Sequence, residues 1–146
     1  MIFTQAHIYL KKALFSIFCG KRLYYFYKCC IFATKSKIME FNQENYQKVL
    51  NYIEQISVEK NIEKAKIIAI SKNHPQSSVL QAIKAGVQAF GENKVQEAEN
   101  KFLSLKKKFK QLELHLTGPL QTNKVKKALS LFNYFHTLDR ERLAKE

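Results

Sequence analysis

The chain of 146 residues contains only four glycines, two prolines and three cysteines. So few chain breakers, together with an apolar share of 46%, are typical of a folded globular chain rather than a disordered or collagen-like one. No uninterrupted apolar run approaches the roughly 20 residues of a membrane-spanning helix, so we expect no membrane span. The chain has no Cys-x-x-Cys pair and no paired histidine and cysteine spacing, which argues against a structural zinc site.

Acidic residues are absent from the first 39 positions, since all 12 lie at Glu40 or later. That segment nevertheless holds 7 of the 25 basic residues, all three cysteines and 9 of the 18 aromatic residues. From Glu40 onward, 18 basic minus 12 acidic residues leave +6 of the total formal charge of +13. The composition therefore predicts a boundary near Met39, with a basic, aromatic leader over residues 1–38 and one domain over residues 39–146.

Several interpretations of the leader compete. A secretory signal fits poorly, because the apolar stretch is short and Lys21 and Arg22 follow it directly. A mitochondrial presequence or a segment lying on an anionic membrane is also conceivable. We favour upstream sequence read in frame, untranslated or disordered, with Met39 as the start. The cysteines then carry no redox information, and the cysteine-free remainder suits a reducing cytoplasm.

From residue 40 onward, helix and strand patterns alternate. Apolar residues at helical spacing after Asn42 predict a first helix with that residue as its cap. Apolar, β-branched segments predict strands over residues 65–70, 87–90, 112–116 and 134–138. Helices are expected between these strands: one opened by Pro75 and ended by Gly86, one over the stripe that contains Phe102, one capped by Thr122 or Asn123, and one begun at Asp139.

This order predicts an α/β fold of parallel strands joined by helical crossovers. Two architectures fit the pattern: an open doubly wound sheet, or part of a (β/α)8 barrel of the TIM type. A dinucleotide-binding Rossmann fold lacks support, because no G-x-G-x-x-G sequence follows the first strand. No G-x-x-x-x-G-K-[ST] phosphate loop occurs either.

In parallel α/β folds, functional groups gather where the strands end. Lys72 follows the first apolar strand directly, where desolvation favours a neutral amine that attacks aldehydes to form a Schiff base. The structural alternative is a lysine that reaches to solvent. Asn93 either contacts a ligand ring or caps the helix that begins there. Glu92 and Glu97 do not make a convincing general acid/base pair, because the sequence gives neither carboxylate a partner at a known distance.

The histidines suggest no metal site. His115 lies among leucines and is expected to be a hydrogen-bonded core residue. His74 and His136 are isolated in the sequence, and no ligand spacing links them.

Four segments resemble, in order, blocks of the pyridoxal phosphate homeostasis protein family, the YggS-type family related to the N-terminal barrel of alanine racemase. They are residues 67–72 (IIAISK), 90–97 (FGENKVQE), 115–124 (HLTGPLQTNK) and 135–139 (FHTLD). The resemblance covers roughly residues 41–146. It implies a (β/α)8 barrel that holds pyridoxal 5′-phosphate (PLP) as a Schiff base on Lys72, with Asn93 in the pocket.

The resemblance also implies a cytoplasmic PLP carrier in vitamin B6 homeostasis, not an enzyme, and a monomer when complete. Only about four βα units fit into residues 39–146, so we expect the N-terminal half of a barrel that needs about 250 residues. The phosphate-binding loops would then lie in the other half, which predicts weak affinity for PLP and a complementing C-terminal fragment as partner. Lys94 departs from the family pattern, which commonly has an aromatic residue there.

Two alternatives belong to other functional classes. A PLP-dependent amino-acid racemase would need a second base opposite the lysine, and the sequence offers none. A nucleic-acid-binding domain would use the lysine clusters at 106–108 and 124–127. These clusters fall on expected helix ends and outer helix faces without interleaved aromatics, so we expect no nucleic-acid partner.

Overall fold

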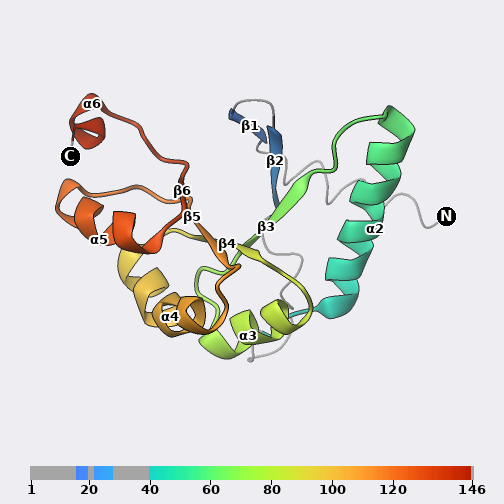
Figure 1. The fold of residues 1–146 in the computed structure, drawn as a ribbon, viewed down its shortest axis with the longest axis horizontal. Helices are drawn as coiled ribbons and strands as arrows, with labels where there is room; N and C mark the ends of the chain where they lie inside the picture. Colours follow the sequence, from blue (N-terminus) through green and yellow to red (C-terminus); the bar gives the residue numbers. More distant parts are fainter. Residues whose placement is uncertain (1–15, 20–21, 28–39, 146) are drawn as a thin grey trace.

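The computed structural model describes residues 16–19, 22–27 and 40–145. The parts of the predicted leader outside those ranges, including Cys29 and Cys30, lie outside the described residues. The described chain is an α/β fold built on one mixed sheet (Figure 1). Whether residues 1–38 form a separate leader stays a prediction.

In the described ranges, the sheet has six strands in the spatial order β1-β2-β3-β4-β5-β6. Their bounds are β1 Ser16–Cys19, β2 Arg22–Tyr27, β3 Lys66–Ile70, β4 Ala89–Glu92, β5 Glu113–Leu116 and β6 Tyr134–Phe135. The pair β1 and β2 is antiparallel, and the four pairs from β2 to β6 are parallel. The parallel arrangement of β3 to β6 confirms the coarser prediction of an α/β fold with parallel strands.

Helices connect the parallel strands one after another. Between β2 and β3 lies α2 (Gln43–Lys60), then α3 (Gln76–Lys84), α4 (Val95–Lys108) and α5 (Val125–Leu131), and α6 (Glu141–Ala144) follows β6. A short 3-10 helix, η1 (Thr122–Lys124), precedes α5. Figure 1 shows α2, α3, α4 and α5 in an arc around one side of the sheet. None of the helices in the described ranges is both long enough and apolar enough to cross a membrane.

Several helix ends follow the expected local chemistry. The Asn42 side chain accepts a hydrogen bond from the Asn45 backbone N–H at 2.8 Å and caps α2, as the sequence predicts. After α3, Gly86 has a φ of +95°, a left-handed conformation that glycine adopts without a steric penalty. The predicted cap at Asp139 is wrong, because its carboxylate accepts from the Arg140 side chain and makes no cap hydrogen bond to α6.

Strand bounds differ modestly from the prediction. The second predicted strand (87–90) is observed two residues later, and the strand predicted over 134–138 is only two residues long. The strands β1 and β2 were not predicted, because they lie in the segment expected to be outside the domain. The pairing of β2 with β3, from Tyr24 opposite Lys66 to Tyr27 opposite Ala69, places a second strand beside β3.

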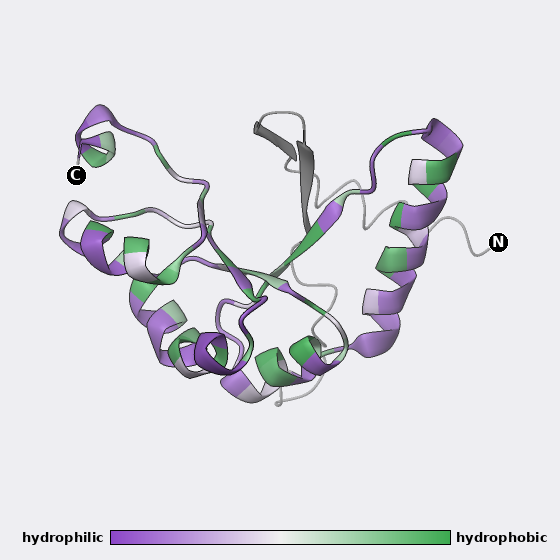
Figure 2. Ribbon diagram, viewed as in Figure 1, coloured by the Kyte–Doolittle hydropathy of each residue, from purple (hydrophilic) through white to green (hydrophobic). Residues whose placement is uncertain are grey.

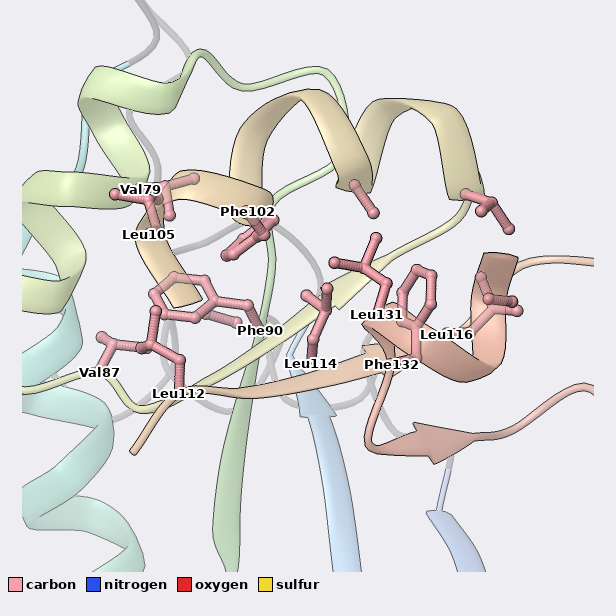
Figure 3. Close-up of a cluster of buried hydrophobic side chains, with 14 of the residues drawn as sticks. Val79, Val87, Phe90, Phe102, Leu105, Leu112, Leu114, Leu116, Leu131 and Phe132 are labelled. Carbon is pink, nitrogen blue, oxygen red and sulfur yellow. The ribbon is translucent and has the colours of Figure 1, made fainter. Parts of the chain in front are cut away.

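One hydrophobic core fills the space between the sheet and its helices. Alternate strand residues face it, among them Ala69, Phe90 and Leu114, which are fully buried. Figure 3 shows Phe90 and Leu114 gathered against α4 and α5, and the rings of Phe90 and Phe102 lie 5.4 Å apart. The helices are amphipathic, with hydrophobic and hydrophilic residues on different sides (Figure 2). The core therefore fixes which strand residues face the helices.

Replacing Phe90 with alanine tests this core. Phe90 is 0% exposed. Its truncation is expected to lower the free energy of unfolding by about 3 to 5 kcal/mol, because it leaves a cavity among packed side chains. Leu129→Ala is the matched control, since Leu129 is 59% exposed and its loss should cost about 0.5 kcal/mol or less. Urea denaturation measures both. An equal loss of unfolding free energy in the two variants would contradict the burial of Phe90 in this core.

Candidate functional site

The carboxyl ends of β3, β4 and β5 meet at one edge of the sheet, because the strands are parallel neighbours. Hydrogen bonds continue just beyond the strands: the Ser71 N–H donates to the Gly91 carbonyl at 3.0 Å, and the Thr117 N–H donates to the Glu92 carbonyl at 2.9 Å. The structure thus brings together the loops that begin at Ser71, Asn93 and Thr117.

Lys72 lies in a tight turn after β3, closed by a hydrogen bond from the His74 N–H to the Ser71 carbonyl at 3.1 Å. The side chain is half-buried rather than fully desolvated. Within the described ranges its ammonium has no ion-pair or hydrogen-bond partner. An amine without an internal partner remains available to react with a ligand.

Asn93 follows β4, in the loop next to the Lys72 turn, and is half-buried. Its side-chain Oδ1 accepts a hydrogen bond from the Thr117 hydroxyl at 3.0 Å. The capping interpretation is wrong, because α4 has Lys94 at its N-cap position and no side-chain cap. No described residue accepts a hydrogen bond from the Asn93 Nδ2 amide, whose two donors are available to a ligand.

Gly118 holds the loop after β5 directly against Asn93. A Cβ at position 118 would lie 2.3 Å from the Asn93 carbonyl oxygen and 2.6 Å from its Cα. Backbone atoms cannot give way as a flexible side chain does, so only glycine permits this approach. This packing role depends on the tertiary fold and was not predicted from the sequence.

A buried ion pair contacts the Lys72 turn and was not predicted from the sequence. Lys101 of α4 places its Nζ 2.6 Å from Glu92 Oε1 and 2.9 Å from Glu97 Oε1. The Ser71 hydroxyl donates to the same Glu92 oxygen at 2.7 Å. The spacing of Glu97 and Lys101, four residues apart on a predicted helix, was the available signal, but the partner on β4 depends on the tertiary fold.

The two carboxyl groups respond differently to this environment. Burial raises the pKa of Glu92, although Lys101 and Ser71 offset part of that effect. Partial burial opposes the ionisation of Glu97, but hydrogen bonds from Lys101 and the Asn73 amide outweigh it and lower the pKa of Glu97. Glu97 is thus the partner of Lys101 that also contacts the Lys72 turn, through the Asn73 N–H.

A second polar cluster lies on the sheet face opposite the helices. His115 is 0% exposed, its Nδ1 lies 2.9 Å from His136 Nε2, and its ring stacks on Tyr134 with centroids 4.5 Å apart. His115 is buried as predicted and hydrogen-bonds through Nδ1, but its Nε2 has no hydrogen-bond partner among the described residues. The parallel pairing of β5 and β6 brings His136, which is isolated in the sequence, beside it. Lys66 and Glu113 form an ion pair on the same face.

Two lysines from the clusters considered for nucleic-acid binding contact other parts of the protein. In one lysine cluster, Lys106 donates to the Leu131 carbonyl at 2.6 Å, and in the other, Lys127 pairs with Glu99 at 2.6 Å. These two side chains therefore have structural partners. Among the described residues, no group of three or more histidines, cysteines or acidic residues could hold a metal ion.

Comparison with known proteins identifies relatives of one kind, although no protein-family model matches the chain. The chain is 38% identical over 104 residues to the pyridoxal phosphate homeostasis protein of Haemophilus influenzae, which covers 70% of this chain and 44% of the relative. It is 44% identical over 79 residues to the protein of the same name from Pasteurella multocida, covering 54% and 34%. The chain thus spans less than half the length of these curated relatives.

The solved structures agree with the sequence relatives. PipY of Synechococcus elongatus, with PLP bound, is 37% identical and superposes with a TM-score of 0.53 over 62% of this chain and 43% of PipY. A protein from Bifidobacterium adolescentis, described as unknown, superposes with a TM-score of 0.63 at 26% identity over 70% of this chain and 46% of its own. The resemblance to pyridoxal phosphate homeostasis proteins predicted from the four sequence segments is confirmed.

The buried histidine pair predicts acid sensitivity. Burial, with His136 and Lys66 nearby, lowers the pKa of His115 from 6.5 to about 3, and burial also lowers the pKa of His136. Each folded-state pKa lies below that of the unfolded chain, so protons favour unfolding. The stability contribution is present above about pH 6.5 and is lost as the pH falls toward 3.

We expect the free energy of unfolding to fall between pH 7.5 and pH 5.5, by about 1 kcal/mol for His115 alone. Urea denaturation at the two pH values measures this fall. In His115→Asn, which removes the ionisable ring, the fall should be smaller by about that amount. An unchanged pH dependence in the variant would contradict the assignment to His115.

Proposed function

We propose that this chain binds PLP and acts in PLP homeostasis, with Lys72 as the point of covalent attachment. The observation that carries the proposal is an amine, at the shared strand edge, that has no partner among the described residues, in a chain whose relatives include a PLP-bound structure. When bound, PLP supplies an aldehyde that condenses with a primary amine and releases water. Lys72 supplies that amine.

The residues at this edge fit such a group. Lys72 lies after β3, and Asn93, after the neighbouring strand, offers side-chain amide donors that suit a polar ring substituent. Thr117 holds Asn93 Oδ1 at 3.0 Å, so the orientation of the amide is fixed before a ligand arrives. The same hydrogen bond leaves the amide nitrogen free for the ligand. Lys72 would thus attach the ligand and Asn93 would orient it.

A carrier role is favoured over catalysis by the state of the acidic groups. Proton transfer at a PLP-bound amino acid needs an acid or base besides the lysine. Glu92 and Glu97 are the carboxyl groups nearest in the chain to this edge, and both are engaged with Lys101. Their engagement supports binding without turnover, and we therefore assign the chain no enzymatic reaction.

The strand order supports the first part of a (β/α)8 barrel as the architecture. The order from β2 to β6 runs without reversal, whereas a doubly wound sheet reverses at a switch point. Residues 39–146 would then form four βα units of an alanine racemase-like barrel. A C-terminal fragment could supply further contacts, and without it we expect weak binding of PLP. We place the chain in the cytoplasm by analogy with the family.

Borohydride trapping tests the attachment site. The complete 146-residue chain is incubated with PLP and reduced, and peptide mass spectrometry locates the labelled lysine. We expect the adduct on Lys72 and its loss in Lys72→Ala. Lys84→Ala is the matched control, because Lys84 is an exposed lysine on α3 and its loss should leave labelling of Lys72 unchanged. Labelling spread over many lysines, unaffected by Lys72→Ala, would refute the proposal.

A further inference from the structure

The backbone on both sides of Lys72 is tied to the same ion pair. On one side, Lys101 Nζ donates to the Ser71 carbonyl oxygen at 2.6 Å. On the other side, the Asn73 N–H donates to Glu97 Oε1 at 2.6 Å. Lys101 and Glu97 are themselves joined at 2.9 Å, so the two contacts form one continuous link around the turn.

The Lys101 end of this link is buried in the interior of the protein. The Lys101 side chain is 9% exposed, and its second partner, Glu92, is 0% exposed. Asn73 adopts a φ of +62°, a left-handed conformation that asparagine tolerates better than most residues. The hydrogen bond from its backbone N–H to Glu97 holds this peptide group in place. The turn that carries Lys72 therefore has a fixed geometry set from α4.

We propose that the ion pair between Lys101 and Glu97 positions Lys72, and that it thereby directs the Lys72 amine at an incoming aldehyde. The inference rests on the proposed function, because it takes Lys72 as the attachment site. Lys101 and Glu97 are positioning residues: they act through the peptide groups on either side of Lys72 and need no contact with the ligand.

Positioning matters here because of the covalent step. Lys72 Nζ attacks the aldehyde carbon, a carbon–nitrogen bond replaces the carbon–oxygen bond, and water leaves. Such a step needs the amine within a narrow range of approach, and a displacement of about 1 Å can slow a reaction about 100-fold. The flexible lysine side chain cannot set its own direction, so the backbone turn must do so. A free exposed lysine lacks this advantage.

Glu97→Ala tests the link with little risk to the fold, because the Glu97 side chain is 25% exposed. Glu99→Ala is a closely matched control: Glu99 lies on the same helix, is 27% exposed and also pairs with a lysine, but it does not contact the Lys72 turn. A double variant, Lys101→Met with Glu92→Gln, removes the buried cation without leaving a buried carboxylate unpaired.

Each full-length variant is treated with PLP for a limited time and reduced with borohydride, and labelling of Lys72 is divided by labelling of Lys84. Circular dichroism in the absorption band of bound PLP, before reduction, reports whether the ligand is held in one orientation. Far-ultraviolet circular dichroism confirms folding. We expect the ratio to fall about tenfold in Glu97→Ala and in the double variant, with loss of the PLP band, and to stay unchanged in Glu99→Ala.

A ratio and a PLP band in Glu97→Ala equal to those of Glu99→Ala would overturn the inference while leaving the proposed function intact. Equal labelling of Lys72 and Lys84 in the unaltered chain would refute the proposed function, and the inference with it. The two outcomes are distinguishable, because the first is measured in Glu97→Ala and the second in the unaltered chain.

Discussion

The contact between Lys101 and Glu92 connects three parts of the molecule that are distant in sequence. Glu92 ends β4, Lys101 lies in the middle of α4, and the Ser71 hydroxyl from the loop after β3 donates to the same carboxyl oxygen. A buried charge is costly unless it is paired and hydrogen-bonded, so these groups must stay together for the fold to persist. The edge at which Lys72 and Asn93 lie thus depends on an electrostatic requirement as well as on apolar packing.

The division between the two faces of the sheet follows from alternation along the strands. On β5, Leu114 and Leu116 face the helices, whereas Glu113 and His115 face the other way. The helix face is apolar and closed by the core, and the opposite face carries stacked rings and ion pairs.

The local pattern was sufficient to predict the order of elements from residue 40 onward, because apolar periodicity and caps such as Asn42 are short-range signals. It also selected the strand ends, where Lys72 and Asn93 lie. It failed where a partner comes from elsewhere in the chain: the Glu92–Lys101 pair, the bond between His115 and His136, and the role of Asn93 toward Thr117. The strands β1 and β2 were missed for a related reason, since their pairing with β3 crosses the compositional boundary on which the prediction relied.

The sequential strand order has a consequence for how the chain is made. Every strand from β3 to β6 pairs in parallel with the strand synthesised immediately before it, with a single crossover between them. Among the described strands, each of these four finds a partner already made, so the sheet can grow from one side as the ribosome releases each βα unit. Assembly by addition means that each parallel pairing closes only one helical crossover at a time. The same order means that a chain stopped after any complete unit still contains every pairing that precedes the stop.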